Sequence, residues 1–284
     1  MSSPGLVRLN ADGSIDAAFD VGSGMPGGGA SAIAVADDGS GDVYVGGGFT
    51  LYNGAPVLRI VRLNADGSVD TSFAPPNGGF DKSVSVIVGV GDGSGRVYVG
   101  GSFTSYNGVT VMGLVRLRSD GSIDSAFDVG SGFDKAVKAI AVAGDGSGDI
   151  YVAGDFTTCN GTSVNRIVRL DADGSIDTGF SVGGGFDDFV FAIAPATDGS
   201  GDVYVGGRFG SYDGASAKGI ARLNADGSLD TGFAAVGFDD DDQVDAILPV
   251  GDGSGDVYVA GRFAAYGTST VDHVVRLNPD GSRD

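Results

Sequence analysis

Glutamate and tryptophan are both missing from this sequence of 284 residues. All 37 acidic residues are therefore aspartates. Glutamate is a good helix former, whereas aspartate favours turns and helix caps, so this choice of acid disfavours helices. The 53 glycines agree, because an all-β fold with many tight turns needs glycine. The composition therefore predicts a globular chain that is rich in turns and strands.

Basic residues and cysteine are also scarce. The 17 Lys and Arg leave a net charge of −20, and we expect no nucleic-acid partner because phosphate binding needs basic patches. Cys159 is the only cysteine, which excludes an intramolecular disulfide and a thiolate zinc site. No apolar run is long enough to span a membrane. The first residues, MSSPG, show no signal-peptide pattern, so a signal peptide would lie upstream.

A ten-residue motif, VRLNADGSID, recurs along the chain at intervals of 53 or 54 residues. Its six copies begin at Val7, Val61, Val115, Val168, Ala221 and Val275. A second marker, of the form GDVYVGGxF, occurs five times in phase with the first. Fixed periods of this length indicate a repeat architecture.

Each repeat reads as four short strands, which we call a to d. In the first repeat they span 31–36, 42–49, 59–64 and 68–73, and all are bounded by turn residues. A four-stranded unit of this length is typical of a β-propeller blade. Strand a is small and apolar and carries Pro195 and Pro249 in two copies, which suits the edge strand nearest the propeller axis.

The pattern F-x-x-Y-N-G, R-I-V-R-L-N-A-D-G-S-I-D-x-x-F and G-D-V-Y-V-G-G-x-F resembles the bacterial delta-sixty repeat, a β-propeller domain of unknown function. The resemblance covers nearly the whole chain. It implies a propeller in large secreted or surface proteins, and it implies no catalytic residues.

We therefore predict an all-β, five-bladed propeller of four-stranded antiparallel blades, forming one domain over residues 1–284. Its units are 31–73, 85–127, 138–180, 191–233 and 245–284, the last completed by residues 5–19. Overlap of the N- and C-terminal strands would close the ring. A six-bladed ring or an open array is the alternative, because strand c is present at both ends of the chain.

The repeated motif itself resembles both a calcium loop and a hairpin turn. In a calcium loop of the EF-hand type, Gly13 at position six would place Arg8 at the first ligand position, where a cation cannot serve. As a hairpin, the motif pairs Leu9 with Ile15 and sets its arginine opposite its last aspartate. We favour the hairpin. The expected structural ion pairs are Arg8–Asp16, Arg62–Asp70, Arg116–Asp124, Arg169–Asp177, Arg222–Asp230 and Arg276–Asp284.

Candidate binding residues lie in the loops that vary among the repeats, the d–a and b–c loops. Their recurring aromatics are Phe80, Phe133, Phe186, Phe238, Tyr52, Tyr106 and Tyr212. We favour packing between blades for the phenylalanines over stacking on a ligand. The run Asp239, Asp240, Asp241 and Asp242 is the best local candidate for a cation site, although such runs are more often solvated. Cys159 replaces a tyrosine and is interpreted as a packing residue.

The first functional hypothesis is a non-catalytic binding or scaffold module, secreted or on the cell surface, with a protein or carbohydrate ligand. Nearly equal repeats, one histidine and no glutamate favour it over an enzyme. A second hypothesis is a calcium-dependent hydrolase or lyase that uses Asp187, Asp188 and the run at 239–242. A third is a structural subunit whose spare N-terminal hairpin completes a blade of another copy. No cofactor is expected, with calcium as the one candidate.

Overall fold

The computed structural model describes residues 5–75, 78–239 and 241–284. These residues form strands, turns and loops, with no helix among them. They belong to two compact units, Met1–Gly132 and Phe133–Asp284. Among the residues described, no helix is long and apolar enough to cross a membrane.

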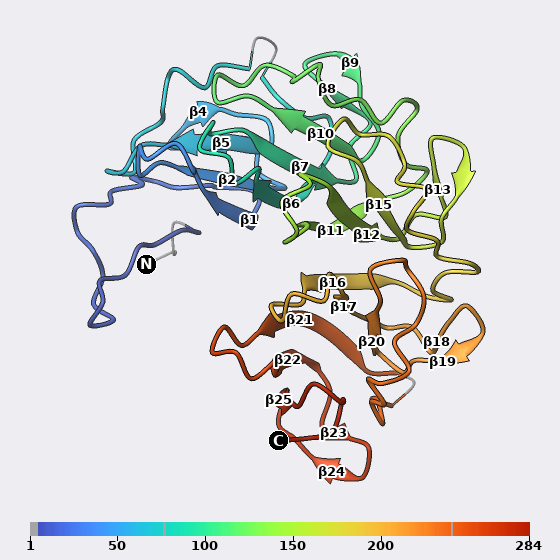
Figure 1. The fold of residues 1–284 in the computed structure, drawn as a ribbon. Helices are drawn as coiled ribbons and strands as arrows, with labels where there is room; N and C mark the ends of the chain where they lie inside the picture. The colour runs from blue at the N-terminus through green and yellow to red at the C-terminus, as the bar shows by residue number, and fades with distance from the viewer. Residues whose placement is uncertain (1–4, 76–77, 240) are drawn as a thin grey trace. The chain divides into compact units, whose positions relative to one another are not determined.

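Each repeat contains one three-stranded antiparallel sheet in which the second strand is central (Figure 1). The sheets of the first unit are β1 (Ala30–Val35), β2 (Val43–Gly47) and β5 (Ile60–Leu63), then β6 (Val84–Gly89), β7 (Val97–Gly101) and β10 (Leu114–Leu117). Those of the second unit are β11 (Val137–Val142), β12 (Ile150–Gly154) and β15 (Ile167–Leu170), then β16 (Val190–Pro195), β17 (Val203–Gly207) and β20 (Ile220–Leu223), then β21 (Gln243–Pro249), β22 (Val257–Arg262) and β25 (Val274–Leu277).

A small two-stranded hairpin lies between the second and third strands of every sheet. The hairpins are β3 (Leu51–Tyr52) with β4 (Ala55–Pro56), β8 (Ser105–Tyr106) with β9 (Val109–Thr110), β13 (Thr158–Cys159) with β14 (Thr162–Ser163), β18 (Ser211–Tyr212) with β19 (Ala215–Ser216), and β23 (Ala265–Tyr266) with β24 (Ser269–Thr270). Repeated three-plus-two strand units of this kind make the fold an all-β propeller of about five to six blades.

The core lies where neighbouring blades pack face to face. Tyr44 of the central strand β2 is buried, because β6 of the next blade packs beside β1 and β2. Val45 points to the opposite face and packs with Val21 and Met25. Gly46 permits the close approach of β6, since a Cβ atom there would lie 2.5 Å from Cγ1 of Val84. The hydrophobic surface of one blade is therefore buried by the next, as expected for a repeat fold.

The predicted fourth strand is wrong. Residues 68–73 contribute a single bridge, Leu63 to Val69, and then leave the sheet. The Asp70 carboxylate accepts hydrogen bonds from the amide and hydroxyl of Ser72, which turns the chain. Phe73 then packs edge-on against Tyr44, with 5.5 Å between the ring centroids. The blades are three-stranded because this aspartate offers the backbone a turn instead of a ladder.

The arginine of each motif copy lies against the last aspartate of the same copy. The nitrogen–oxygen distances are 2.8 Å for Arg8–Asp16, 3.2 Å for Arg62–Asp70, 2.7 Å for Arg116–Asp124, 3.3 Å for Arg169–Asp177, 3.5 Å for Arg222–Asp230 and 3.3 Å for Arg276–Asp284. In the first complete blade Arg62 also reaches Asp38 and Asp42 of the a–b turn. The arginine thus ties the c–d hairpin to the a–b turn of its own blade.

Candidate functional site

The aromatic residues predicted as ligand contacts are core residues. Phe80, Phe133, Phe186 and Phe238 are 0–3% exposed, and Tyr52, Tyr106 and Tyr212 are 0–1% exposed. A ligand in solvent cannot stack on rings that are covered in this way, so the prediction of ligand contact is wrong for them. The phenylalanines fill the space beneath the b–c hairpins, as the packing interpretation predicts.

Their packing explains why the same residue types recur. The ring of Phe80 lies 4.3 Å from that of Phe103 and 4.6 Å from that of Tyr106, between ring centroids. The Tyr106 hydroxyl donates a hydrogen bond of 2.6 Å to the carbonyl of Gly121, which anchors the hairpin to the c–d turn. Cys159 takes the tyrosine position in its repeat, and burial raises the pKa of its thiol to about 12. It is therefore a packing residue and a poor nucleophile at neutral pH.

The loops of the second unit form one charged pocket of about 350 Å³. Its charged lining residues come from four loops and include Asp187 and Asp188 before β16, Arg208 after β17, Lys218 before β20, and Asp239 and Asp242 before β21. This pocket brings together four of the aspartates that the hydrolase hypothesis named. Asp241 is exposed and outside the pocket lining, and Asp240 lies outside the described residues.

Asp187 has a structural role that two other repeats share. Its carboxylate accepts hydrogen bonds from the amides of Gly210 and Ser211 and from the Ser211 hydroxyl. Asp81 and Asp134 hold the b–c loops of their own repeats in a similar way, each accepting hydrogen bonds from two successive amides and from the hydroxyl of the first of those residues. Partial burial opposes ionisation of Asp187, but the hydrogen bonds from Ser211 and Gly210 outweigh it and lower its pKa.

The other charged groups of the pocket are partly compensated. Arg208 donates from Nε and from a terminal nitrogen to the Asp188 carboxylate, each at 3.2 Å. The Asp242 carboxylate accepts a hydrogen bond of 3.3 Å from the Asp239 amide. Carboxylates therefore outnumber cations in this pocket, which can offer both donors and acceptors to a polar ligand.

A second acidic group, absent from the sequence predictions, lies between the a–b turn and the c–d turn of the first blade in this unit. Carboxylate oxygens of Asp149, Asp171 and Asp177 lie within 4.8 Å of one another. Arg169 forms ion pairs of 2.7 Å with Asp149 and 3.3 Å with Asp177, so a protein cation already compensates this charge. The signal in the sequence was Asp171, which stands where the other motif copies have asparagine or arginine.

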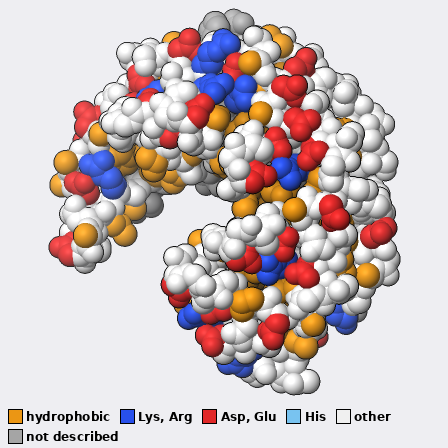
Figure 2. Space-filling view, viewed as in Figure 1, with side chains coloured by type: hydrophobic (Ala, Val, Ile, Leu, Met, Phe, Trp, Pro, Cys, Tyr) orange, Lys and Arg blue, Asp and Glu red, His pale blue; other side chains and the backbone are white. Residues whose placement is uncertain are grey.

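The surface as a whole is acidic. Figure 2 shows carboxylate side chains spread over the visible face, with basic side chains scattered among them and not gathered into one patch. Such a surface does not favour a polyanionic ligand.

Comparisons with solved structures give likenesses of low identity. The chain is similar to a protein of unknown function from Bacteroides caccae, with 10% identity and a TM-score of 0.47, over 92% of this chain and 84% of that one. It is similar to the WD40 beta propeller domain of Doa1, with 12% identity and a TM-score of 0.38, over 89% of this chain and 93% of that one. A third protein, named a "putative gluconolactonase", shares 16% identity at a TM-score of 0.47, over 91% of this chain and 77% of that one. These likenesses are too low to carry a conclusion about activity.

No curated protein matches the sequence. One family model matches six successive segments, at residues 2–19, 39–73, 93–127, 142–180, 199–233 and 253–284. These segments follow the repeats and together cover more than half of the chain. The chain therefore belongs to the family described as "Domain of unknown function (DUF5122) beta-propeller".

Proposed function

We propose that the chain is a non-catalytic binding module whose ligand occupies the charged pocket of the second unit. The observation that carries the proposal is the convergence of side chains that depart from the repeat. Asp188 stands where two earlier repeats have lysine, and Lys218 stands where the repeats of the first unit have Leu58 and Met112. In a repeat protein, positions that vary among otherwise similar loops are where binding specificity arises.

The ionisation of the described aspartates supports binding over catalysis. A general acid needs a carboxyl whose pKa is raised towards neutrality. Among the described residues, every aspartate with a displaced pKa has it lowered, and Asp187 in the pocket is one of them. These groups stay ionised at neutral pH and act as hydrogen-bond acceptors.

The pocket fits a neutral ligand with several hydroxyl groups, and a carbohydrate is the class we propose. Aspartates accept hydrogen bonds from sugar hydroxyls, while Arg208 and Lys218 donate to their oxygens. A polyanion is disfavoured, because the pocket holds four aspartates and two cations and the chain has a net charge of −20.

A glycan array with matched variants tests this proposal. Arg208→Ala removes a pocket side chain, whereas Asp155→Ala changes the residue at the same place in the preceding repeat, outside the pocket lining. We expect the wild-type chain and Asp155→Ala to bind the same neutral glycans, and Arg208→Ala to lose them. Binding that survives Arg208→Ala, or an array with no bound glycan, contradicts the proposal. Runs with and without calcium decide whether a cation takes part.

We further propose that the module works outside the cell, as the resemblance to the delta-sixty repeat implies. We also propose that the chain is one domain with five blades, closed into a ring by its terminal strands.

A structural subunit is the second candidate, and exposed apolar faces favour it. Tyr258 and Val274 of the last blade are 41% and 54% exposed, whereas the matching Tyr204 and Ile220 are buried. In the first unit Ile33 is exposed, whereas the matching Ile87 is buried. Each unit thus presents one sheet face of the kind that is buried between blades, and another copy could cover it.

A further inference from the structure

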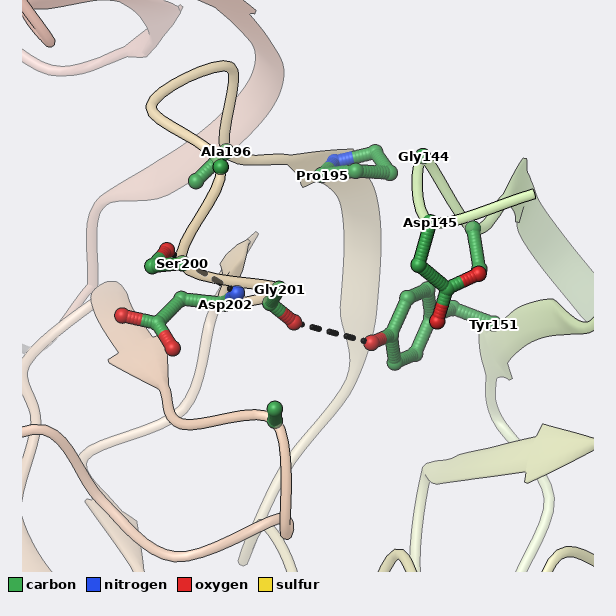
Figure 3. A pocket seen from close by; sticks show the side chains of 11 residues that line it. Gly144, Asp145, Tyr151, Pro195, Ala196, Ser200, Gly201 and Asp202 are labelled. Carbon is green, nitrogen blue, oxygen red and sulfur yellow. Dashed lines mark hydrogen bonds between the residues drawn. The ribbon is translucent and has the colours of Figure 1, made fainter. Parts of the chain in front are cut away.

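A separate pocket of about 280 Å³ lies at the a–b turns of the second unit (Figure 3). It is bounded on one side by Gly144 and Tyr151 and on the other by the turn that joins β16 to β17. Glycines and a serine of that turn, Gly199, Ser200 and Gly201, line it, together with small apolar residues such as Pro195.

In the first unit, a carboxylate occupies the corresponding place. Asp37, two residues after β1, reaches the a–b turn of the next blade. One of its oxygens accepts hydrogen bonds from the amides of Gly91 at 2.7 Å and Gly93 at 3.3 Å. The other accepts one from the amide of Gly95 at 2.7 Å. Three backbone donors from alternate residues thus form an anion-binding cradle, which we call the amide cradle.

The turn in the second unit has the same construction. Gly199 and Gly201 have φ values of +79° and +80°, against +77° and +71° for Gly93 and Gly95. In both turns an aspartate accepts a hydrogen bond from the serine amide, of 3.0 Å for Ser200 and 3.1 Å for Ser94. In both, a tyrosine of the preceding blade donates to the carbonyl of the last glycine, Tyr151 to Gly201 and Tyr44 to Gly95. The amides of Thr197, Gly199 and Gly201 therefore match those that hold Asp37.

Two residues of the turn differ, Thr197 for Gly91 and Asp202 for Arg96, and so does the residue that would fill the cradle. Gly144 follows β11 by two residues, as Asp37 follows β1, and it has no side chain. Within the described part of the chain, the amides of Thr197, Gly199 and Gly201 donate to no protein acceptor. Gly201 is half-buried, whereas Thr197 and Gly199 are exposed, and each of these amides gains a partner from outside the protein when an acceptor is added.

We infer that this pocket binds the carboxylate group of a small ligand, which takes the place that Asp37 takes in the first unit. The nearby acidic groups are already compensated. Asp145 lies 2.9 Å from Arg169, and Asp202 lies 2.9 Å from Arg222. In the first unit Asp37 is accommodated beside Asp38, whose partner Arg62 lies at 2.6 Å, with Arg96 at the position where the second unit has Asp202.

The surroundings define the ligand as a monocarboxylate with a small neutral body. Ala143, Pro195 and Ala225 give the pocket an apolar wall next to the amides. The net charge of −20 disfavours ligands that carry several negative charges. This inference does not depend on the loop pocket proposed above, because the two sites share no lining residue.

Acetate is the probe, and the glycine amide signals in proton–nitrogen correlation spectra are the readout. Sodium acetate replaces sodium chloride at constant ionic strength in the full chain. We expect the amide protons of Thr197, Gly199 and Gly201 to move downfield and to saturate, because a carboxylate acceptor deshields them. The amides of Gly93 and Gly95 are the internal control, since Asp37 already occupies their cradle.

Two reciprocal substitutions sharpen the test. A Cβ at Gly144 meets nothing within 4 Å, so Gly144→Asp supplies the missing carboxylate without a steric clash. It should shift the Gly199 and Gly201 amides in the absence of acetate and weaken acetate binding at least about tenfold. Asp37→Gly should make Gly93 and Gly95 respond to acetate. If Asp37→Gly unfolds, acetate binding by the wild type and by Gly144→Asp still tests the inference.

Wild-type amides of Gly199 and Gly201 that do not respond to acetate overturn the inference, and so does unchanged acetate binding by Gly144→Asp. A second titration uses N-acetyl-aspartyl amide, which carries the Asp37 side chain as a blocked residue. Tighter binding of this probe than of acetate identifies a protein side chain as the source of the carboxylate. Equal or weaker binding identifies a free small acid.

Discussion

At the residue scale, a single aspartate can form ion pairs with several arginines, and Asp124 is the clearest case. It is buried, and its oxygens lie 2.7 Å from Arg116, 2.9 Å from Arg96 and 3.1 Å from Arg118. We expect Asp124→Asn to lower the free energy of unfolding by about 3–5 kcal/mol, because it leaves buried positive charge without compensation. Urea unfolding measures this loss. Asp16→Asn is the matched control, since Arg8 is 41% exposed and solvent screens that pair. Equal losses for the two variants would contradict the expectation.

Acid pH should destabilise the chain through the same residues. Burial opposes ionisation of Asp124, but hydrogen bonds from Arg96, the Ala126 amide and Arg116 lower its pKa to about 2. Burial likewise opposes ionisation of Asp81, and hydrogen bonds from Thr104 and Ser105 lower its pKa to about 2. The stabilisation is complete above about pH 4 and is lost as the pH falls towards 2, because the unfolded chain then binds protons that the folded chain does not.

Thermal midpoints measured between pH 5 and pH 2 test this expectation. The midpoint should fall steadily below about pH 4, and Asp81→Asn should make the fall shallower because one linked group is gone. A midpoint that stays level over this interval would show that the lowered pKa values do not contribute to stability.

At the scale of the element, each central strand has at or next to its end a glycine that the β-bulge of its neighbour requires. In the second unit a Cβ at Gly154 would collide with the carbonyl of Ala136 and lie 3.0 Å from the Lys138 amide. Gly206, one residue earlier in its own strand, faces side-chain atoms of Val244 and Ile247 and no main chain, and two other repeats have alanine at that position. We expect Gly154→Ala to cost about 3 kcal/mol and Gly206→Ala about 1 kcal/mol, because main chain yields less readily than side chain. Chemical denaturation of both variants checks the order, and the reverse order would contradict it.

The same scale shows what could be predicted from the sequence. Strands a, b and c follow from local signals, namely alternation and glycine-rich turns with aspartate, which fix register over short distances. Residues 68–73 show the same alternation of side-chain types as a strand, yet the side chain of Asp70 turns the chain after a single bridge. Whether Phe80 meets a ligand or the core depends on the residues packed around it, which no local pattern encodes. The amide cradle depends on a contact between Asp37 and the turn of the next blade, which likewise no local pattern encodes.

At the scale of the whole molecule, the exposed sheet faces decide between a ring and a chain of copies. Our proposal of a ring predicts that the face carrying Tyr258 is covered in solution at every protein concentration. The sequence has no tryptophan, so Tyr258→Trp places a single reporter there. Val109→Trp, at an exposed site on a b–c hairpin, is the solvent reference.

We expect the Tyr258→Trp emission to be blue-shifted from that of Val109→Trp and to resist quenching by acrylamide at high and low protein concentration. Burial that appears only as the concentration rises would favour assembly of copies, because association follows mass action whereas closure within one chain does not. Emission that matches the reference throughout would contradict the ring and leave this apolar face open to solvent. Light scattering on the same samples supplies the mass that separates a closed monomer from an assembly.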